Sequence, residues 1–113
     1  MIPSIVNMQD AFSLKGKNAL VTGGNRGLGL AIASAFAQQG ANVAIFCRDA
    51  KKAAEAIEEL KPYGGKYQSF SCDVTNLPNV REVVAKAWDE FGGFDILVNN
   101  AGVTCVSELL DMD

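Results

Sequence analysis

Short apolar runs alternate along the chain with longer segments in which apolar residues recur every three or four positions. The short runs are largely apolar rather than strictly alternating, which is typical of strands buried on both faces of a sheet. Such strands are expected over residues 18–23, 42–47, 67–72 and 95–100. A helical pattern follows each of the first three. The chain therefore predicts the order strand, helix, strand, helix, strand, helix, strand.

Capping and helix-breaking residues indicate where each helix begins and ends. The first helix is expected to begin near Gly27 and to stop at Gly40, as helices commonly do at a glycine. Its expected buried face consists of Leu28, Ile32, Ala35 and Phe36.

The second and third helices have clearer N-terminal signals. The second is expected to follow Asp49, a good N-cap, and to end at Pro62. The third is expected after Asn76, with Pro78 in its first turn, and to run to Gly92 and Gly93. The expected buried positions are Ala53, Ile57 and Leu60 in the second helix, and Val80, Val83, Val84, Ala87 and Phe91 in the third.

This alternation of strands and helices predicts an α/β fold with a doubly wound parallel sheet and helices on both faces. Right-handed crossovers place the strands in the order 3-2-1-4. A crevice is then expected at the carboxyl ends of strands one and four. The glycine-rich segment 22–29 and the segment 99–102 both fall there.

Composition narrows the function classes. The 113 residues carry a net charge of −3 without a dense Lys/Arg cluster, which argues against nucleic-acid binding. No apolar run approaches the roughly 20 residues of a membrane span, and the first residues do not resemble a signal peptide. A single globular, cytoplasmic domain is expected.

Cysteine and histidine content argues against a metal site. The chain has no histidine, and Cys47, Cys72 and Cys105 are widely spaced without a CxxC pair. Cys47 and Cys72 are expected to be small buried hydrophobic residues at strand ends, with redox chemistry as the alternative. No metal site is predicted.

The glycine-rich segment "TGGNRGLG" lies between the first strand and the first helix. A diphosphate requires backbone N–H groups that point at it and no side chains in the way, and such a turn supplies both. Gly23 is expected to make the turn, Gly27 to let the backbone approach the phosphates, and Gly29 to let the helix pack on the sheet. The alternative is a tight strand-to-helix turn without a ligand. No GK[ST] sequence follows, so a P-loop is excluded.

The end of the second strand, "IFCRD", bears on the choice of dinucleotide. An NAD site usually presents an acid there to the ribose hydroxyls, whereas a 2′-phosphate calls for arginine. Cys47 stands at the place expected for the acid, Arg48 follows it, and Arg26 is expected close by, which together favour NADP over NAD. The alternative for Arg48 is a solvated surface charge. Asp49 is expected to be an N-cap, with a ribose contact as its alternative.

Three segments in order, "TGGNRGLG", "CDVT" and "NNAG", resemble the cofactor-binding half of the short-chain dehydrogenase/reductase family, of the compact rather than the extended type. The resemblance covers residue 12 to the end, and the leader "FSLKGKNALVTG" resembles sugar and polyol enzymes such as gluconate 5-dehydrogenase-like members. It implies a Rossmann-type fold and an NADP-dependent oxidoreductase that interconverts carbonyls and secondary alcohols. For the full-length protein it also implies a small-molecule carbonyl or alcohol substrate and a homo-oligomer.

The resemblance also implies roles for single residues. Around the phosphates and the adenosine ribose it places Gly23, Asn25, Arg26, Gly27, Leu28 and Gly29, with Arg48 at the 2′-phosphate. The adenine ring would meet Asp73 and the Val74 backbone, although Asp73 could instead cap the next helix. On the ribose and nicotinamide side it places Asn100, Ala101 and Gly102, while Asn99 would tie strand four to its neighbour.

The catalytic groups of this family lie beyond the "NNAG" segment. The family uses a Tyr with a Lys four residues later, a Ser and an Asn. Neither Tyr63 nor Tyr67 has such a lysine, so no catalytic residue is assigned. We expect residues 1–113 to be one NAD(P)-binding domain, truncated before its catalytic residues, with residues 1–13 as an N-terminal extension. The alternatives are a non-catalytic dinucleotide-binding module and an inactive remnant.

Overall fold

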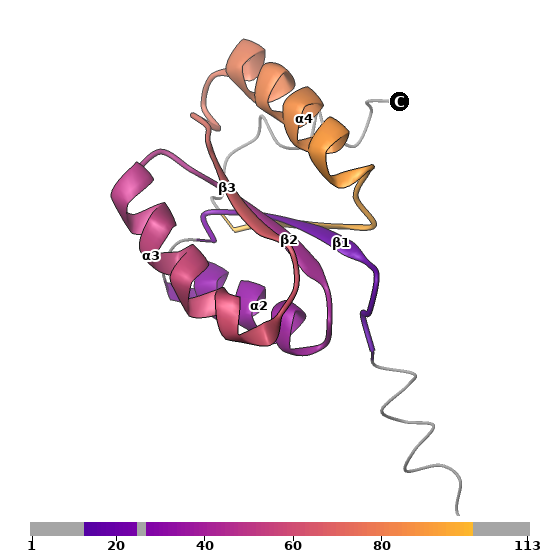
Figure 1. The fold of residues 1–113 in the computed structure, drawn as a ribbon. Helices are drawn as coiled ribbons and strands as arrows, with labels where there is room; N and C mark the ends of the chain where they lie inside the picture. Colours follow the sequence, from indigo (N-terminus) through magenta and orange to yellow (C-terminus); the bar gives the residue numbers. More distant parts are fainter. Residues whose placement is uncertain (1–12, 25–26, 101–113) are drawn as a thin grey trace, which may run out of the picture.

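A computed structural model describes residues 13–24 and 27–100 (Figure 1). Strands and helices alternate in the predicted order. The elements are β1 (Asn18–Thr22), α2 (Gly27–Gln38), β2 (Asn42–Cys47), α3 (Ala50–Leu60), a 3-10 turn η1 (Lys61–Tyr63), β3 (Tyr67–Ser71), α4 (Leu77–Phe91) and β4 (Ile96–Asn99).

The four strands form one parallel sheet in the order β3-β2-β1-β4, which confirms the predicted order 3-2-1-4. In the inner strand β1, Val21 pairs with Ile45 of β2 and with Val98 of β4. Helices α2 and α3 cover one face of the sheet and α4 covers the other (Figure 1). The chain therefore has the doubly wound α/β arrangement that its pattern predicts.

Each face of the sheet has its own apolar core, built from alternate residues of the same strands. On the α4 side, Leu20 and Phe46 pack with Phe70, and the Phe46 and Phe70 rings meet edge to face with centroids 5.8 Å apart. On the α2 and α3 side, Val21 and Ile45 pack with the helices. Side chains of a strand point alternately to opposite faces, so β1 and β2 contribute to both cores.

Helices α3 and α4 follow their predicted signals. The Asp49 carboxylate accepts hydrogen bonds from the backbone N–H groups of Lys51 and Lys52, and Asn76 caps α4 through the N–H of Asn79. Gly92 ends α4 in a left-handed conformation with φ 77°. Their buried residues are Ala53, Ala56 and Leu60 in α3, and Val80, Val83, Val84 and Ala87 in α4.

The predicted buried face of α2 is wrong at two of its four positions, while Ile32 and Phe36 are half-buried and Phe36 packs against the core. Leu28 is 69% exposed and Ala35 is also exposed, whereas the buried residues of the helix are Gly29, Ala33 and Ala37. These three small residues lie four positions apart on one face, and their size lets the helix backbone approach the sheet closely. Almost every residue of α2 is apolar or small, so apolar periodicity could not identify the packed face.

Polar side chains connect the amino ends of the strands. The Asn18 side chain donates to the carbonyls of Phe91 and Gly93, each at 2.9 Å, and its oxygen accepts from Asn42 Nδ2 at 2.9 Å. The Asn42 oxygen in turn accepts from the N–H of Lys66 at 2.9 Å. One chain of hydrogen bonds thus joins β1, β2 and the loops that precede β3 and β4.

None of the helices in residues 13–24 and 27–100 has the length and the apolar content needed to cross a membrane.

Candidate functional site

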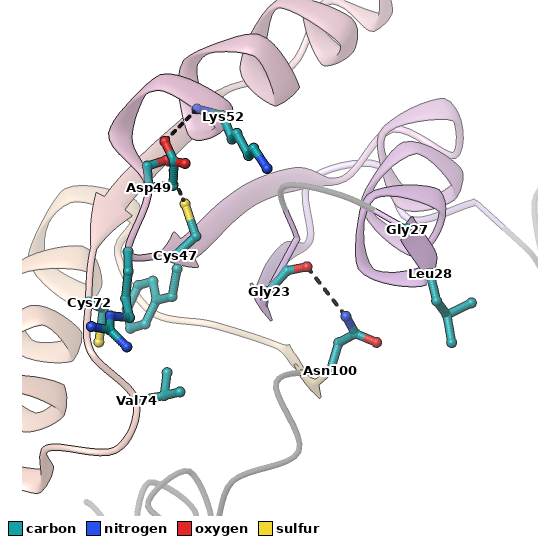
Figure 2. A pocket seen from close by; sticks show the side chains of 11 residues that line it. Gly23, Gly27, Leu28, Cys47, Asp49, Lys52, Cys72, Val74 and Asn100 are labelled. Atoms are coloured by element: carbon teal, nitrogen blue, oxygen red, sulfur yellow. Dashed lines mark hydrogen bonds between the residues drawn. The ribbon is translucent and has the colours of Figure 1, made fainter.

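A pocket of about 650 Å³ opens at the carboxyl ends of the strands (Figure 2). This volume lies in the range of sites for small molecules and cofactors. Among the described residues, its lining consists of Gly23, Gly27, Leu28, Phe46, Cys47, Arg48, Asp49, Lys52, Cys72, Val74 and Asn100. The pocket therefore lies where the strand order reverses, which is the usual ligand position in open α/β sheets.

The glycines of the first turn have different structural roles. Gly23 adopts φ 66°, and its N–H donates to the Phe46 carbonyl at 2.8 Å, so this amide continues the sheet and is not free for a ligand. Gly27 has φ 57°, and a Cβ placed there would meet no atom of the described residues within 4 Å. A Cβ on Gly29 would lie 2.1 Å from the Gly23 carbonyl oxygen. Gly23 thus makes the turn, Gly27 leaves the backbone accessible, and Gly29 permits close packing.

The ends of β1 and β4 are joined beside this turn. The hydroxyl of Thr22, which is fully buried, lies 3.2 Å from Asn99 Oδ1 and accepts the backbone N–H of Asn100 at 3.1 Å. The Asn100 side chain donates to the Gly23 carbonyl at 3.3 Å (Figure 2). Asn99 ties β4 to β1, which confirms its predicted structural role.

The end of β2 and the start of α3 form the opposite wall. The Cys47 thiol donates to the Asp49 backbone carbonyl at 3.5 Å, and Asp49 Oδ1 accepts the N–H groups of Lys51 and Lys52 at 3.0 and 3.1 Å. The Asp49 carboxylate therefore acts as the predicted N-cap. Arg48 and Lys52 line the same wall and give it positive charge.

Both thiols that line the pocket are protonated at neutral pH. Burial raises the pKa of Cys47, although a hydrogen bond at Asp49 partly opposes the shift. Burial, with a smaller contribution from the charge of Asp73, raises the pKa of Cys72 to about 11. Cys47 thus presents a neutral group where an NAD site would present a carboxylate.

The segment after β3 holds an acid beside the pocket. Asp73 Oδ1 accepts hydrogen bonds from the hydroxyl of Thr75, at 2.5 Å, and from its backbone N–H, at 3.0 Å. These two hydrogen bonds lower the pKa of Asp73, with the charge of Arg48 acting in the same direction. The cap of α4 is Asn76, so the alternative that Asp73 caps this helix is wrong.

The structure brings most of the predicted site residues together. Those that line the pocket are Gly23, Gly27, Leu28, Arg48, Val74 and Asn100. Gly29 packs directly behind the turn and Asp73 adjoins Val74. Outside the described residues lie Asn25, Arg26, Ala101 and Gly102.

Sequence reasoning missed three residues that line the pocket, Lys52, Phe46 and Cys72. Phe46 lies near the end of β2 and Cys72 directly follows β3, and both also belong to the apolar core on the α4 side, where Cys72 was expected to be buried. One feature of the sequence could have identified Lys52 as a pocket residue. It is the third residue of a helix that begins directly after β2, and the N-terminus of that helix faces the carboxyl edge of the sheet.

Comparisons with known proteins agree with this geometry. The sequence model of the family described as short chain dehydrogenase matches residues 17–113. Sorbose reductase of Candida albicans is 45% identical over 97 residues, which cover 86% of this chain and 34% of that protein. The crystal structure of L-sorbose reductase from Gluconobacter frateurii, complexed with NADPH and L-sorbose, matches with a TM-score of 0.77 at 40% identity, over 81% of this chain and 35% of that one.

A further solved structure covers nearly all of the chain. This is 2-keto-3-deoxy-D-gluconate dehydrogenase from Streptococcus agalactiae, with a TM-score of 0.78 at 37% identity, over 97% of this chain and 41% of that one. The chain thus spans 34% to 41% of the length of these three proteins. The family match, the parallel sheet and the pocket at its carboxyl edge lead to one conclusion. The chain belongs to the short-chain dehydrogenase family.

Proposed function

We propose that this chain is the cofactor-binding part of an NADP(H)-dependent oxidoreductase that interconverts a carbonyl and a secondary alcohol on a sugar or polyol. In this proposal the described strands and helices belong to one dinucleotide-binding domain, residues 1–13 are an extension, and the catalytic residues are carried by a longer protein. The observation that carries the proposal is the pocket wall at the end of β2. There a neutral thiol, Cys47, stands beside the cations of Arg48 and Lys52.

The charges on this wall favour NADP over NAD. An NAD site needs a carboxylate that accepts the ribose hydroxyls. The Asp49 carboxylate accepts the backbone N–H groups of α3 instead, and Cys47 is neutral. Arg48 offers the planar guanidinium that suits a phosphate. The related L-sorbose reductase was crystallised with NADPH, which supports the same choice.

The backbone around the glycine turn fits a dinucleotide. Gly27 opens onto the pocket, and a side chain there would occupy space that the phosphates need. Leu28 follows it at the helix N-terminus, where backbone N–H groups favour anions. Val74 and Asp73 would hold the adenine ring, and Asn100 would hold the ribose next to the nicotinamide. When bound, the nicotinamide supplies the hydride acceptor or donor.

The substrate class rests on the relatives. Sorbose reductases and a 2-keto-3-deoxy-D-gluconate dehydrogenase are among the similar proteins, so a sugar, sugar acid or polyol is the expected substrate. The experiment is to follow NADPH consumption with L-sorbose, D-fructose and 2-keto-3-deoxy-D-gluconate, using the protein encoded by the complete gene. Consumption with one of these supports the proposal. Cofactor binding without turnover on any carbonyl would favour a non-catalytic binding module.

The cofactor preference is tested on the 113-residue chain by calorimetric titration with NADPH and NADH. We expect NADPH to bind at least about tenfold more tightly, a difference of about 1.4 kcal/mol. Cys47→Asp should reverse the preference, because it adds a carboxylate at the ribose. Ser71→Asp is the control, since it adds the same charge at an exposed position in register with Cys47 and outside the pocket lining. Equal affinities for both cofactors would overturn the proposed NADP dependence.

A further inference from the structure

Lys52 lies in the first turn of α3 and lines the pocket together with the glycine turn. Figure 2 shows its side chain extending from the helix away from the Asp49 carboxylate and toward the side of Gly23. Among residues 13–24 and 27–100, no ion pair engages its ammonium group. The neighbouring Lys51 belongs to the same turn but does not line the pocket.

The backbone position of Lys52 is fixed by hydrogen bonds of the first turn. Asp49 Oδ1 accepts the backbone N–H of Lys52 at 3.1 Å, which anchors the first turn of α3. The Cys47 thiol donates to the Asp49 carbonyl and so ties that turn to the end of β2. Among the described lining residues, Asp49 carries the one carboxylate and uses it for capping, so the cations of Arg48 and Lys52 stay available to the pocket.

Two cations on one wall suit a ligand with a compact double negative charge, and a phosphate monoester has that charge. Resting on the proposed NADP dependence, we propose that Lys52 is a specificity-determining residue that binds the 2′-phosphate of the cofactor together with Arg48. Arg48 supplies the planar donor fork, and Lys52 supplies a point charge from the helix side. The pyrophosphate is served separately, by the backbone at Gly27.

The test uses two small probes, adenosine 2′,5′-bisphosphate and 5′-AMP, which differ in the 2′-phosphate alone. Each is titrated calorimetrically into the 113-residue chain and into Lys52→Gln, Lys51→Gln and Lys52→Arg. Lys52→Gln should weaken the bisphosphate about tenfold and change 5′-AMP by less than about twofold, as expected for a single charge-assisted contact. Lys52→Arg should restore most of the affinity, and Lys51→Gln should leave both probes unchanged. Far-ultraviolet circular dichroism confirms that each variant is folded.

The outcomes separate this inference from the proposed function. If the unaltered chain does not prefer the bisphosphate, the proposed NADP dependence fails and this inference fails with it. If the chain prefers the bisphosphate and Lys52→Gln keeps that preference, the role of Lys52 is overturned while NADP dependence stands. An equal loss for both probes places Lys52 at the 5′-phosphate and also overturns the inference. If Lys51→Gln weakens binding of the bisphosphate as much as Lys52→Gln does, the effect is general electrostatic attraction. That outcome also overturns the inference.

Discussion

Gly29 is the point at which the first helix, the glycine turn and the end of β4 meet without a side chain between them. A Cβ there would lie 2.1 Å from the Gly23 oxygen and 2.6 Å from Asn100 Nδ2. Both neighbours are held by the sheet, since the Gly23 N–H is bonded to β2 and the Asn100 N–H to Thr22. The helix would therefore have to move for any larger residue to fit.

We expect Gly29→Ala to destabilise the fold by about 2 kcal/mol, because overpacking outweighs the roughly 1 kcal/mol that alanine gains in a helix. The measurement is urea unfolding followed by circular dichroism. Gly24→Ala is the control, because its Cβ would meet side-chain atoms of Ile45 and Val21 at 3.2 to 3.3 Å, a much smaller overlap than the 2.1 Å approach to backbone at Gly29. A Gly29→Ala variant at least as stable as Gly24→Ala would contradict this account.

Asp73 gives the site a dependence on pH. Its pKa is lowered mainly by the hydrogen bonds from Thr75, so the carboxylate stabilises the fold above about pH 4, and this contribution is lost as pH falls through the lowered pKa. Thr75→Val should move the pKa of Asp73 up toward its ordinary value of about 3.9, whereas Thr75→Ser should keep it low. Titration of the carboxyl carbon by NMR measures both. A pKa unchanged in Thr75→Val would show that the hydroxyl is not the cause.

At the scale of elements, Asn18 connects β1 to the loop that joins α4 to β4. Its side chain donates to the carbonyls of Phe91 and Gly93. Asn18→Asp removes both donors and leaves two carbonyls without this partner, so we expect a loss of about 2 to 3 kcal/mol. Asn42→Asp is the matched comparison, because it removes one donated bond and keeps the oxygen that accepts from Lys66. The urea midpoint of unfolding should be lower for Asn18→Asp than for Asn42→Asp. The reverse order would refute the stabilising role assigned to the two hydrogen bonds that Asn18 donates.

Elements with strong end signals could be predicted from the sequence. Asp49, Asn76 and Gly92 mark their helix ends through side-chain oxygens or a left-handed glycine, and the parallel order followed from the alternation of strands and helices. The packed face of α2 could not be predicted in this way. There the small residues Gly29 and Ala33 face the sheet, because close approach of two backbones outweighs burial of a larger side chain such as Leu28.

The sequence predicted those residues of the candidate site that belong to short motifs, and missed those whose role depends on their position in space. Gly27, Arg48 and Asn100 are recognisable because they stand at strand ends within short motifs. Lys52 lies within a helix that exposes several other charged residues, and only the three-dimensional position of the first turn separates it from Lys51. The contact of the Cys47 thiol with the Asp49 carbonyl likewise depends on a hydrogen bond that no spacing reveals.

At the scale of the whole molecule, the two cores share the sheet and should unfold together. Leu60 is fully buried on the α2 and α3 side, and Val80 is fully buried on the α4 side. Leu60→Ala should cost about 2 to 5 kcal/mol. It should also shift the unfolding transition seen by Trp88, the single tryptophan, which lies on α4 across the sheet. Val80→Ala should shift the circular dichroism transition of the whole molecule in the same way. Separate transitions for the two probes would show that the faces unfold independently.

The hydrogen bonds of Asn100 have a consequence for chimeric proteins. They hold the end of β4 at the mouth of the pocket, so whatever sequence follows starts from a fixed position beside the glycine turn. A junction placed directly after this residue could join the domain to the remaining segments of different relatives without disturbing the turn. The domain would then act as an interchangeable part, with nucleotide preference inherited from one parent and substrate choice from the other.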